Sequence, residues 1–294
     1  MKIIADSGST KTDWRLMASD GRTLDIVTRG INPAVQTEAY VGETIGTELA
    51  ARAVSSGWLV RGEDGGLTSA DSTLLYIYYY GAGCIEPFST VVMSALRQTF
   101  GTGAHIEVAS DLLGAARALC QHGEGLACIL GTGSNSCLYD GCAIVANTPP
   151  LGYILGDEGS GAVLGRNFYN LLLKGHLPSE VADDFFERTN LTRADIIREV
   201  YRGQAPNRYL ASVSPFIAEH IGVPQLRDMV VDSFRRFFRM NVAPYGRNDL
   251  SVNAVGSIAH AYRALLDEAA QAEGFTLGRV EQKPLDGLTA YHQN

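Results

Sequence analysis

The sequence predicts an α/β protein made of two similarly built domains, each with a mainly parallel sheet that has antiparallel edges. Strand-like apolar runs alternate with helix-period segments along most of the 294 residues, a pattern typical of parallel sheets with connecting helices. A glycine hairpin near the start, IIADSGST at 3–10, has a counterpart in CILGTGSN at 128–135, and each begins a meander of three strands. This repeat indicates two domains of one design that face each other.

The first half of the chain contains a β-meander followed by alternating helices and strands. An Asp20-Gly21 turn separates the second and third strands of the meander, because Asp-Gly between alternating runs favours a hairpin. Apolar residues at helical spacing predict a helix over about 36–55. The predicted elements are strands at 2–6, 12–18, 23–30, 73–81 and 105–110 and helices at about 36–55, at 87–100 and from Asp111 onward.

The second half restarts the same pattern at residue 125. Three strands are predicted within 125–147, and a mostly helical stretch follows from 158 to about 242. A strand at 250–256, a helix at 257–274, a strand at 276–282 and a closing helix from Pro284 complete the chain, with proline at the first turn of that helix. The repeat places the domain boundary near residue 110, so we expect domains at 1–110 and 111–283.

Composition narrows the function classes. The net charge is −8 and no basic tract occurs, so the field of the protein disfavours nucleic acid and anionic membranes as partners. Apolar runs are too short for a signal peptide or a membrane span. Five cysteines form neither an even disulfide set nor a CxxC pair, which favours reduced thiols in a cytoplasmic protein. Cys137 and Cys142 can face each other across a hairpin, although buried thiols are the simpler interpretation.

The two hairpins have the composition of phosphate-binding turns. Backbone N–H groups, hydroxyls and the absence of Cβ atoms suit a phosphate, and two tips from facing domains can hold a triphosphate between them. Asp6 beside the first tip adds an oxygen ligand suited to Mg²⁺. No Walker loop is present. Plain hairpin turns are the alternative, since glycine, serine and asparagine are common there, but the matched pair favours phosphate.

Four motifs in order, DSGSTKT, GTGSNS, LGDEGSG and GSIAHAY, resemble the acetate and sugar kinase, Hsc70 and actin superfamily. Within it the chain resembles the N-acetylglucosamine kinase branch, which is grouped with the BadF/BadG/BcrA/BcrD ATPases. The resemblance spans essentially the whole chain. It implies two actin-like, ribonuclease H-like domains, each with a mixed five-stranded sheet and flanking helices, and an active site in the interdomain cleft. It also implies that the closing helix 284–294 joins the first domain and that 158–242 is a helical insertion in the second.

The same resemblance implies an ATP and Mg²⁺ site. The first hairpin holds the β- and γ-phosphates, the second contacts the nucleotide, and the Gly256-Ser257 turn lies against adenosine. Asp6 holds the metal. The residues implied for ATP are Ser7, Gly8, Ser9, Thr10, Lys11, Thr132, Gly133, Gly256 and Ser257. From the residues alone, Lys11 is better explained as a solvated lysine on a strand edge.

For the acceptor, the resemblance implies Asp111 as the general base and sugar contacts from Asn32, Ser134, Asn135, Gly152 and Asp157. Asp111, Asn32 and Asp157 each have a plainer interpretation. Asp111 opens a helix, so capping is the alternative, although Ser110 is available as the cap. Asn-Pro is a frequent turn opener, which leaves Asn32 open, and an acid at 157 suits the N-terminus of a following helix. Glu158 is a further candidate for the metal environment.

Departures from the family pattern occur in both sites, but they alter the sugar-facing wall and leave the phosphate-binding pattern intact. Pro149-Pro150-Leu151-Gly152 replaces a glycine-rich, tryptophan-containing loop, and Ser9 and Ser257 stand where glycines are frequent. We therefore expect a kinase that phosphorylates a hydroxyl of an amino sugar, the 6-hydroxyl of N-acetylglucosamine first. N-acetylmuramic acid or glucosamine as substrate, a BadF-type ATPase that activates a partner reductase, and a non-catalytic sensor remain alternatives. The oligomeric state stays open, with a homodimer as one option.

Overall fold

The computed structural model describes residues 1–62 and 65–293, which divide into two compact units. The first unit contains Met1–Gln121 and Pro284–Asn294, and the second contains His122–Lys283. The closing helix therefore belongs to the first unit, as the resemblance implied. The division falls after Gln121, and not after residue 110, because the helix that begins at Asp111 packs on strands of the first unit and on the closing helix.

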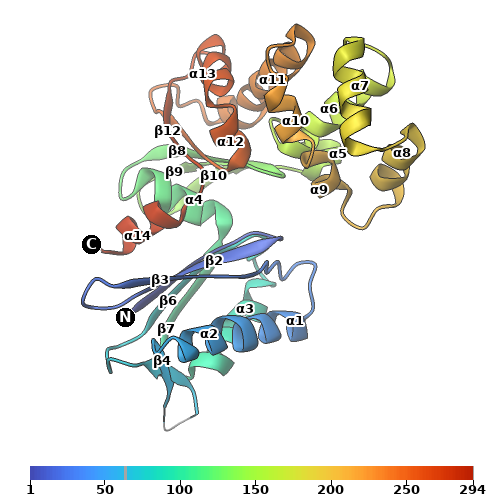
Figure 1. Ribbon diagram of the computed structural model, residues 1–294. Coiled ribbons are helices and arrows are strands. Elements are labelled where there is room, and N and C mark those ends of the chain that lie inside the picture. The colour runs from blue at the N-terminus through green and yellow to red at the C-terminus, as the bar shows by residue number, and fades with distance from the viewer. Residues whose placement is uncertain (63–64, 294) are drawn as a thin grey trace. The chain divides into compact units, whose positions relative to one another are not determined.

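The first unit is a five-stranded mixed sheet with helices on both faces (Figure 1). Its strand order is β3-β2-β1-β6-β7, in which β1 pairs antiparallel with β2 and parallel with β6. The elements are β1 (Lys2–Ser7), β2 (Lys11–Met17), β3 (Thr23–Arg29), α1 (Glu38–Glu43), a π-helical turn (Thr44–Leu49), α2 (Ala50–Ser55), β4 (Leu59–Arg61), β5 (Leu67–Ser69), β6 (Tyr76–Gly81), α3 (Ser89–Phe100), β7 (His105–Ser110), α4 (Asp111–Cys120) and α14 (Leu285–Gln293).

Alternation along β1 builds a core on each face of this sheet. Ile3 and Ala5 join the cluster on the face covered by α1, α2 and α3, and Ile4 joins the cluster formed with α4 and α14. Figure 1 shows these two groups of helices on opposite sides of the sheet. Successive side chains of a strand point to opposite faces, so a strand buried on both sides reads as the continuous apolar run seen at residues 3–5.

The closing helix is held by an aromatic and polar network. The His292 ring stacks on Tyr78 with centroids 3.6 Å apart, and its Nε2 forms a hydrogen bond of 2.8 Å with the Tyr80 hydroxyl. Arg117 of α4 donates to the same hydroxyl at 2.6 Å and pairs with Glu107 of β7. Because these partners lie on α4, β6, β7 and α14, the network joins the end of the chain to the first sheet.

The second unit repeats the same sheet, with strand order β10-β9-β8-β11-β12. Its strands are β8 (Gly125–Leu130), β9 (Ser134–Tyr139), β10 (Ile144–Thr148), β11 (Val252–Val255) and β12 (Leu277–Glu281). As in the first unit, the leading strand pairs antiparallel with the next and parallel with a later one. Both predicted mixed five-stranded sheets, and the repeat that relates them, are thereby confirmed.

Helices fill the segment between β10 and β11, as predicted for 158–242. They are α5 (Gly152–Leu155), α6 (Gly161–Leu173), α7 (Ser179–Thr189), α8 (Arg193–Arg202), α9 (Pro206–Ala211), α10 (Ser214–Glu219), α11 (Pro224–Phe237), a π-helical turn (Phe238–Val242) and a 3₁₀ turn (Ala243–Tyr245). The predicted helix at 257–274 is divided into α12 (Ser257–Ala261) and α13 (Arg263–Ala272). Among the described residues, no helix combines the length and the apolar character needed to cross a membrane.

Candidate active site

Three strand ends in the first unit meet at one edge of the sheet. In the parallel pairs, Ser7 of β1 is opposite Gly81 of β6, and Gly81 is opposite Ser110 of β7. Asp6 and Asp111 therefore lie at the carboxyl ends of strands in the same sheet. Open α/β sheets bind ligands at this edge. The strand register therefore places Asp6, predicted to bind the metal, and Asp111, predicted to be the base, at the same end of one sheet.

Electrostatics at Tyr79 agree with this placement. Burial raises the pKa of the Tyr79 hydroxyl, and its interactions with Cys84, Asp6 and Asp111 raise it further. Because Coulomb interactions weaken with distance, both carboxylates lie within reach of one buried hydroxyl. Tyr79 is a residue of this site that was not singled out from the sequence.

Asp111 is the first residue of α4 and is partly buried. The helix cap is Ser110, whose Oγ accepts a hydrogen bond from Leu113 N at 3.2 Å. Asp111 Oδ1 accepts from the Leu112 N–H at 2.9 Å. Burial raises the pKa of Asp111, and the backbone N–H groups oppose that shift. The capping alternative therefore falls to Ser110, and the Asp111 carboxyl is a desolvated group whose proton affinity is increased.

The first hairpin tip is exposed at two of its predicted phosphate-binding positions. Gly8 N donates to Lys11 O at 3.0 Å, and both Gly8 and Thr10 are exposed. Ser7, by contrast, is fully buried, and its Oγ contacts Thr12 Oγ1 at 2.7 Å and donates to Ile31 O at 3.0 Å. The Ser7 side chain therefore serves the fold, whereas Gly8 and Thr10 of the tip are exposed to solvent.

Two residues from the end of the meander hold this tip. A Cβ at Gly30 would lie 2.5 Å from Gly8 O and from Thr10 N, so only glycine permits this approach. Asn32 Nδ2 donates to Ser9 Oγ at 3.0 Å, and Asn32 Oδ1 accepts from Ala34 N at 3.2 Å. The Asn-Pro turn and the contact with the hairpin are thus both present. Gly30 was not singled out from the sequence.

Asp13 is a carboxylate close to Asp6 that was not singled out from the sequence. In the hairpin register Asp13 of β2 is opposite Asp6 of β1, and residues directly opposite project to the same face. Lys11 Nζ pairs with Asp13 Oδ2 at 2.8 Å, so the lysine predicted to contact ATP is engaged with a carboxylate in this structure. The four residues of the turn, Gly8 to Lys11, fix this register. The length of the turn is therefore the sequence signal that could have identified Asp13 as the residue opposite Asp6.

The second hairpin is built into its surroundings by backbone contacts. Gly131 N donates to Gly133 O at 3.0 Å, and Gly131 O and Thr132 O accept from the first N–H groups of α6 at 2.8 and 3.1 Å. Gly256 lies close to the start of the same hairpin, since a Cβ there would be 2.7 Å from the Leu130 carbonyl carbon. Thr132, Gly133 and the Gly256-Ser257 turn are therefore neighbours, at the carboxyl ends of β8 and β11.

Asp157 lies directly against this hairpin. A Cβ at Gly133 would be 3.0 Å from Asp157 Oδ2. Burial raises the pKa of Asp157 to about 6, a hydrogen bond from the Ser134 N–H opposes the shift, and the charge of Glu158 adds to it. Ser134 Oγ is buried and has no hydrogen-bond partner among the described residues. A buried hydroxyl without a partner beside a carboxylate is suited to a polar ligand.

The remaining predicted sugar residues have different environments. Asn135 Oδ1 accepts hydrogen bonds from Ser136 N and from Asn147 Nδ2, each at 2.9 Å. Gly152 begins α5 with a φ of 73°, in a loop closed where Asp157 N donates to Pro150 O at 2.9 Å. Asn135 is therefore partly engaged with β10, and Gly152 is connected to Asp157 through one closed loop.

Solved structures of sugar kinases resemble the whole chain. A proposed N-acetylglucosamine kinase from Porphyromonas gingivalis is 46% identical, with a TM-score of 0.89 over 100% of this chain and 99% of that one. The chain belongs to the actin-like sugar kinase superfamily. No protein-family model matches it, and neither does any curated protein sequence.

More distant sugar kinases share the fold. A proposed N-acetylglucosamine kinase from Chromobacterium violaceum is 20% identical, with a TM-score of 0.76 over 99% of this chain and 98% of that one. A ROK-family glucokinase from Streptomyces griseus, solved with glucose and AMPPNP, is 17% identical, with a TM-score of 0.50 over 99% and 98% of the two chains. These two likenesses concern the fold alone.

The residues of this sugar kinase fit a magnesium ion at the first hairpin. Mg²⁺ keeps most of its waters and needs only one or two carboxylates besides the phosphates of its nucleotide. Asp6 and Asp13, opposite each other on neighbouring strands, supply such a pair. Among residues 1–62 and 65–293, no group of three or more histidine, cysteine or acidic side chains is placed to hold a metal by itself. The donor set therefore suits a nucleotide-bound Mg²⁺ better than a metal caged by protein.

Proposed function

We propose that the chain is a kinase that transfers the γ-phosphoryl group of Mg²⁺-ATP to a hydroxyl of N-acetylglucosamine, the 6-hydroxyl first. The observation that carries this proposal is the strand register of the first unit. It brings Asp6, the exposed Gly8–Thr10 tip and Asp111 to one sheet edge. A metal-binding carboxylate, a phosphate-binding turn and a base are the parts that phosphoryl transfer needs. The 46% identity to a proposed N-acetylglucosamine kinase supports the amino sugar.

ATP is held by the two glycine hairpins in this proposal. The backbone N–H groups of Ser9 and Thr10 bind the β- and γ-phosphates, and Gly8 lets them approach closely because it has no Cβ. Thr132 and Gly133 contact the nucleotide. The Gly256-Ser257 turn lies beside the second hairpin and contacts the adenosine. Asp6, supported by Asp13 on the facing strand, holds Mg²⁺. Bound Mg²⁺ offsets the charge of the phosphates. The contact predicted for Lys11 requires that lysine to leave Asp13.

The acceptor hydroxyl is positioned and activated by Asp111. The acceptor oxygen forms a bond to the γ-phosphorus as the bridging P–O bond to ADP breaks, and the hydroxyl proton passes to the Asp111 carboxylate. Catalysis of this kind depends mainly on alignment, so the base accepts the proton late. A desolvated carboxylate with a raised pKa suits that task, because a base works best when its pKa approaches the working pH.

Sugar hydroxyls are bound by the remaining predicted residues. Asp157 accepts hydrogen bonds from the sugar, and the buried Ser134 hydroxyl gains a partner on binding. Asn32, Asn135 and the Gly152 loop complete the contacts. Charged acceptors form the stronger hydrogen bonds, so Asp157 contributes most when it is ionised.

ADP release with Mg²⁺, measured against a panel of sugars, tests the proposal. The panel contains N-acetylglucosamine, glucosamine, N-acetylmuramic acid and glucose, with a control lacking sugar. We expect the highest kcat/KM for N-acetylglucosamine and no release in the absence of Mg²⁺. ADP release that no sugar stimulates would favour an ATPase over a kinase.

A further inference from the structure

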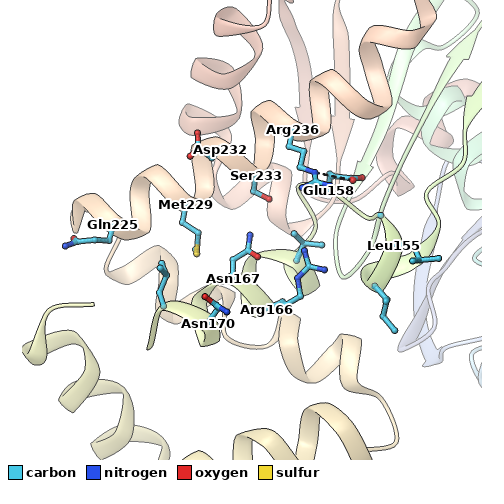
Figure 2. Close-up of a pocket in the computed structure, with 14 residues that line it drawn as sticks. Leu155, Glu158, Arg166, Asn167, Asn170, Gln225, Met229, Asp232, Ser233 and Arg236 are labelled. Atoms are coloured by element: carbon cyan, nitrogen blue, oxygen red, sulfur yellow. Dashed lines mark ion pairs between the residues drawn. The ribbon is translucent and has the colours of Figure 1, made fainter. Parts of the chain in front are cut away.

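The second unit contains a pocket that the proposed reaction does not use. It has a volume of about 610 Å³ and lies between α6, α11 and the residues at 154–158 (Figure 2). Small-molecule sites commonly have volumes of about 300–1,000 Å³. Of the residues proposed for ATP or the sugar, none lines this pocket among the described residues. Gly156 and Glu158, which do line it, flank Asp157 in the chain.

The lining balances positive and negative charge. Arg166 and Arg236 are matched by Glu158 and Asp232, and Arg236 Nε lies 3.5 Å from Glu158 Oε1. A site whose charged side chains sum to zero does not favour a nucleotide or another multiply charged anion. The charge balance therefore favours a ligand that is neutral overall.

Amides and a small apolar surface complete the wall. Asn167 and Asn170 of α6 and Gln225 of α11 offer both donors and acceptors, and Met229 of α11 points toward Asn167 (Figure 2). Groups that both donate and accept, next to an apolar contact, match the alternating hydroxyls and C–H faces of a saccharide. A purely apolar ligand would leave these amides without partners, which is costly.

A buried hydroxyl in the wall supports a polar ligand independently. Ser233 is 6% exposed and its Oγ has no hydrogen-bond partner among the described residues. Glu158 is 8% exposed and accepts from Asn241 Nδ2 at 3.2 Å, so a charged group also lies deep in this wall. Buried polar atoms are nearly always paired, and a ligand hydroxyl supplies what Ser233 lacks.

The pocket is connected to the proposed acceptor site through one loop. Ile154, Leu155 and Gly156 line it, and the same loop closes where Asp157 N donates to Pro150 O at 2.9 Å. Arg166 Nη1 donates to Tyr153 O at 2.9 Å, which ties a pocket residue of α6 to that loop. A ligand that shifts Glu158 or Arg166 therefore acts on the backbone that carries Asp157.

We propose that this pocket binds a small neutral saccharide and that its occupancy changes the affinity of the acceptor site through the loop that carries Asp157. The second part rests on the proposed kinase function, whereas the first part does not. Site-to-site coupling of this kind typically changes affinity about 5- to 150-fold. A fivefold or larger shift in the KM for the acceptor is therefore the expected effect of filling the pocket.

Hydrogen exchange on the full chain tests the binding. The probe is the β-1,4-linked dimer of N-acetylglucosamine at millimolar concentration, without ATP. Asn170→Trp fills the pocket from an exposed position on α6, and Lys174→Trp, just past the end of the same helix and outside the lining, is the matched control. We expect the dimer to protect amides in 154–158 and 224–237 of the native chain and of Lys174→Trp, and not of Asn170→Trp.

Kinetics with N-acetylglucosamine as acceptor then test the coupling. We expect the dimer to shift the KM for N-acetylglucosamine in the native chain and in Lys174→Trp. In Asn170→Trp the dimer should leave that KM unchanged. Absence of protection in the pocket segments overturns the site, whether or not the chain proves to be a kinase. Inhibition by the dimer that persists in Asn170→Trp places the dimer in the acceptor site and also contradicts the proposal. Thermal melting confirms that both variants are folded.

Discussion

At the scale of single residues, Asp111 has an environment that separates a catalytic role from a structural one. Its helix is capped by Ser110, and burial raises the pKa of the Asp111 carboxyl. Asn keeps the shape of the side chain and removes a charge that is costly to bury. The variant Asp111→Asn should therefore keep its fold and lose its reaction.

For Asp111→Asn we expect kcat to fall about 10²- to 10⁴-fold, the usual contribution of a general base. The melting temperature at neutral pH should stay the same or rise, because the native state no longer holds a desolvated carboxylate. Steady-state ADP release and thermal melting measure the two effects. Asp228→Asn, an exposed position on α11, is the control and should change neither. Normal turnover in Asp111→Asn would remove Asp111 from the mechanism.

Asp157 predicts a pH dependence of sugar binding. Its pKa is about 6, so the side chain is ionised at pH 7.5 and mostly protonated at pH 5. If the ionised form binds the sugar, affinity should fall roughly tenfold at pH 5, about one pH unit below this pKa. Titration calorimetry with N-acetylglucosamine at the two pH values measures the change. Asp157→Asn should bind more weakly at pH 7.5 and lose most of the dependence.

The same raised pKa affects stability in the opposite sense to a salt-bridged acid. Between the unfolded pKa of about 3.9 and the folded value near 6, the native state binds more protons, so stability falls as the pH rises through this window. Above pH 6 Asp157 is ionised in the native state. The resulting loss in the free energy of unfolding is then fully present, at most about 2 kcal/mol after allowance for partial exposure. Chemical denaturation should show Asp157→Asn more stable than the native chain at pH 8, with the difference closing toward pH 4. A constant difference across this range would contradict the assignment.

At the scale of elements, the glycine hairpins depend on close backbone contacts. Gly30 leaves no space for a side chain beside Gly8 and Thr10. In Gly30→Ala the tip must move, so we expect the KM for ATP to rise at least about tenfold and stability to fall by about 1–3 kcal/mol. Gly103→Ala is the matched control, since its Cβ would meet no atom within 4 Å. ATP saturation kinetics and urea denaturation distinguish the two variants.

The elements that could be predicted from sequence are those with strong local patterns. Apolar runs at 3–5 and 126–130 identified the leading strands, and the matched hairpins identified two sheets of one design. The short β4–β5 hairpin and α5 were missed, because three or four residues carry too little periodicity to identify. Tyr262, where the predicted helix breaks, is a buried residue whose hydroxyl donates to Ser214 O at 2.6 Å, a contact that the local sequence cannot reveal.

The residues of the candidate site also divide into those that a local sequence pattern could identify and those that it could not. Asp6 was recognisable because it lies beside the first hairpin tip, and Asp111 because the family resemblance implied it as the base. Asp13 was accessible through the hairpin register. The contact of Asp157 with Gly133 and the pairing of Glu158 with Arg236 join segments far apart in sequence. Such contacts depend on how α6 and α11 pack, which no local pattern specifies.

At the scale of the whole molecule, the last helix of the chain completes the first unit. Leu288 of α14 is fully buried in the cluster that contains Ile4 and Tyr80. Leu288→Ala should lower the free energy of unfolding by about 2–5 kcal/mol, the usual cost of a large-to-small change in a core. Hydrogen exchange should increase in β1 and α4 more than in the second unit. Leu74→Ala, which is 51% exposed, is the control, with an expected change within about 0.5 kcal/mol. Equal loosening of both units would contradict the assignment of α14 to the first.

The central claim is that this chain moves a phosphoryl group from ATP to a sugar. Phosphorus NMR of a reaction containing Mg²⁺, ATP and N-acetylglucosamine tests it directly. We expect a sugar 6-phosphate resonance that grows in step with ADP and is lost in Asp111→Asn. Inorganic phosphate as the only product besides ADP, formed at the same rate with or without sugar, would contradict it.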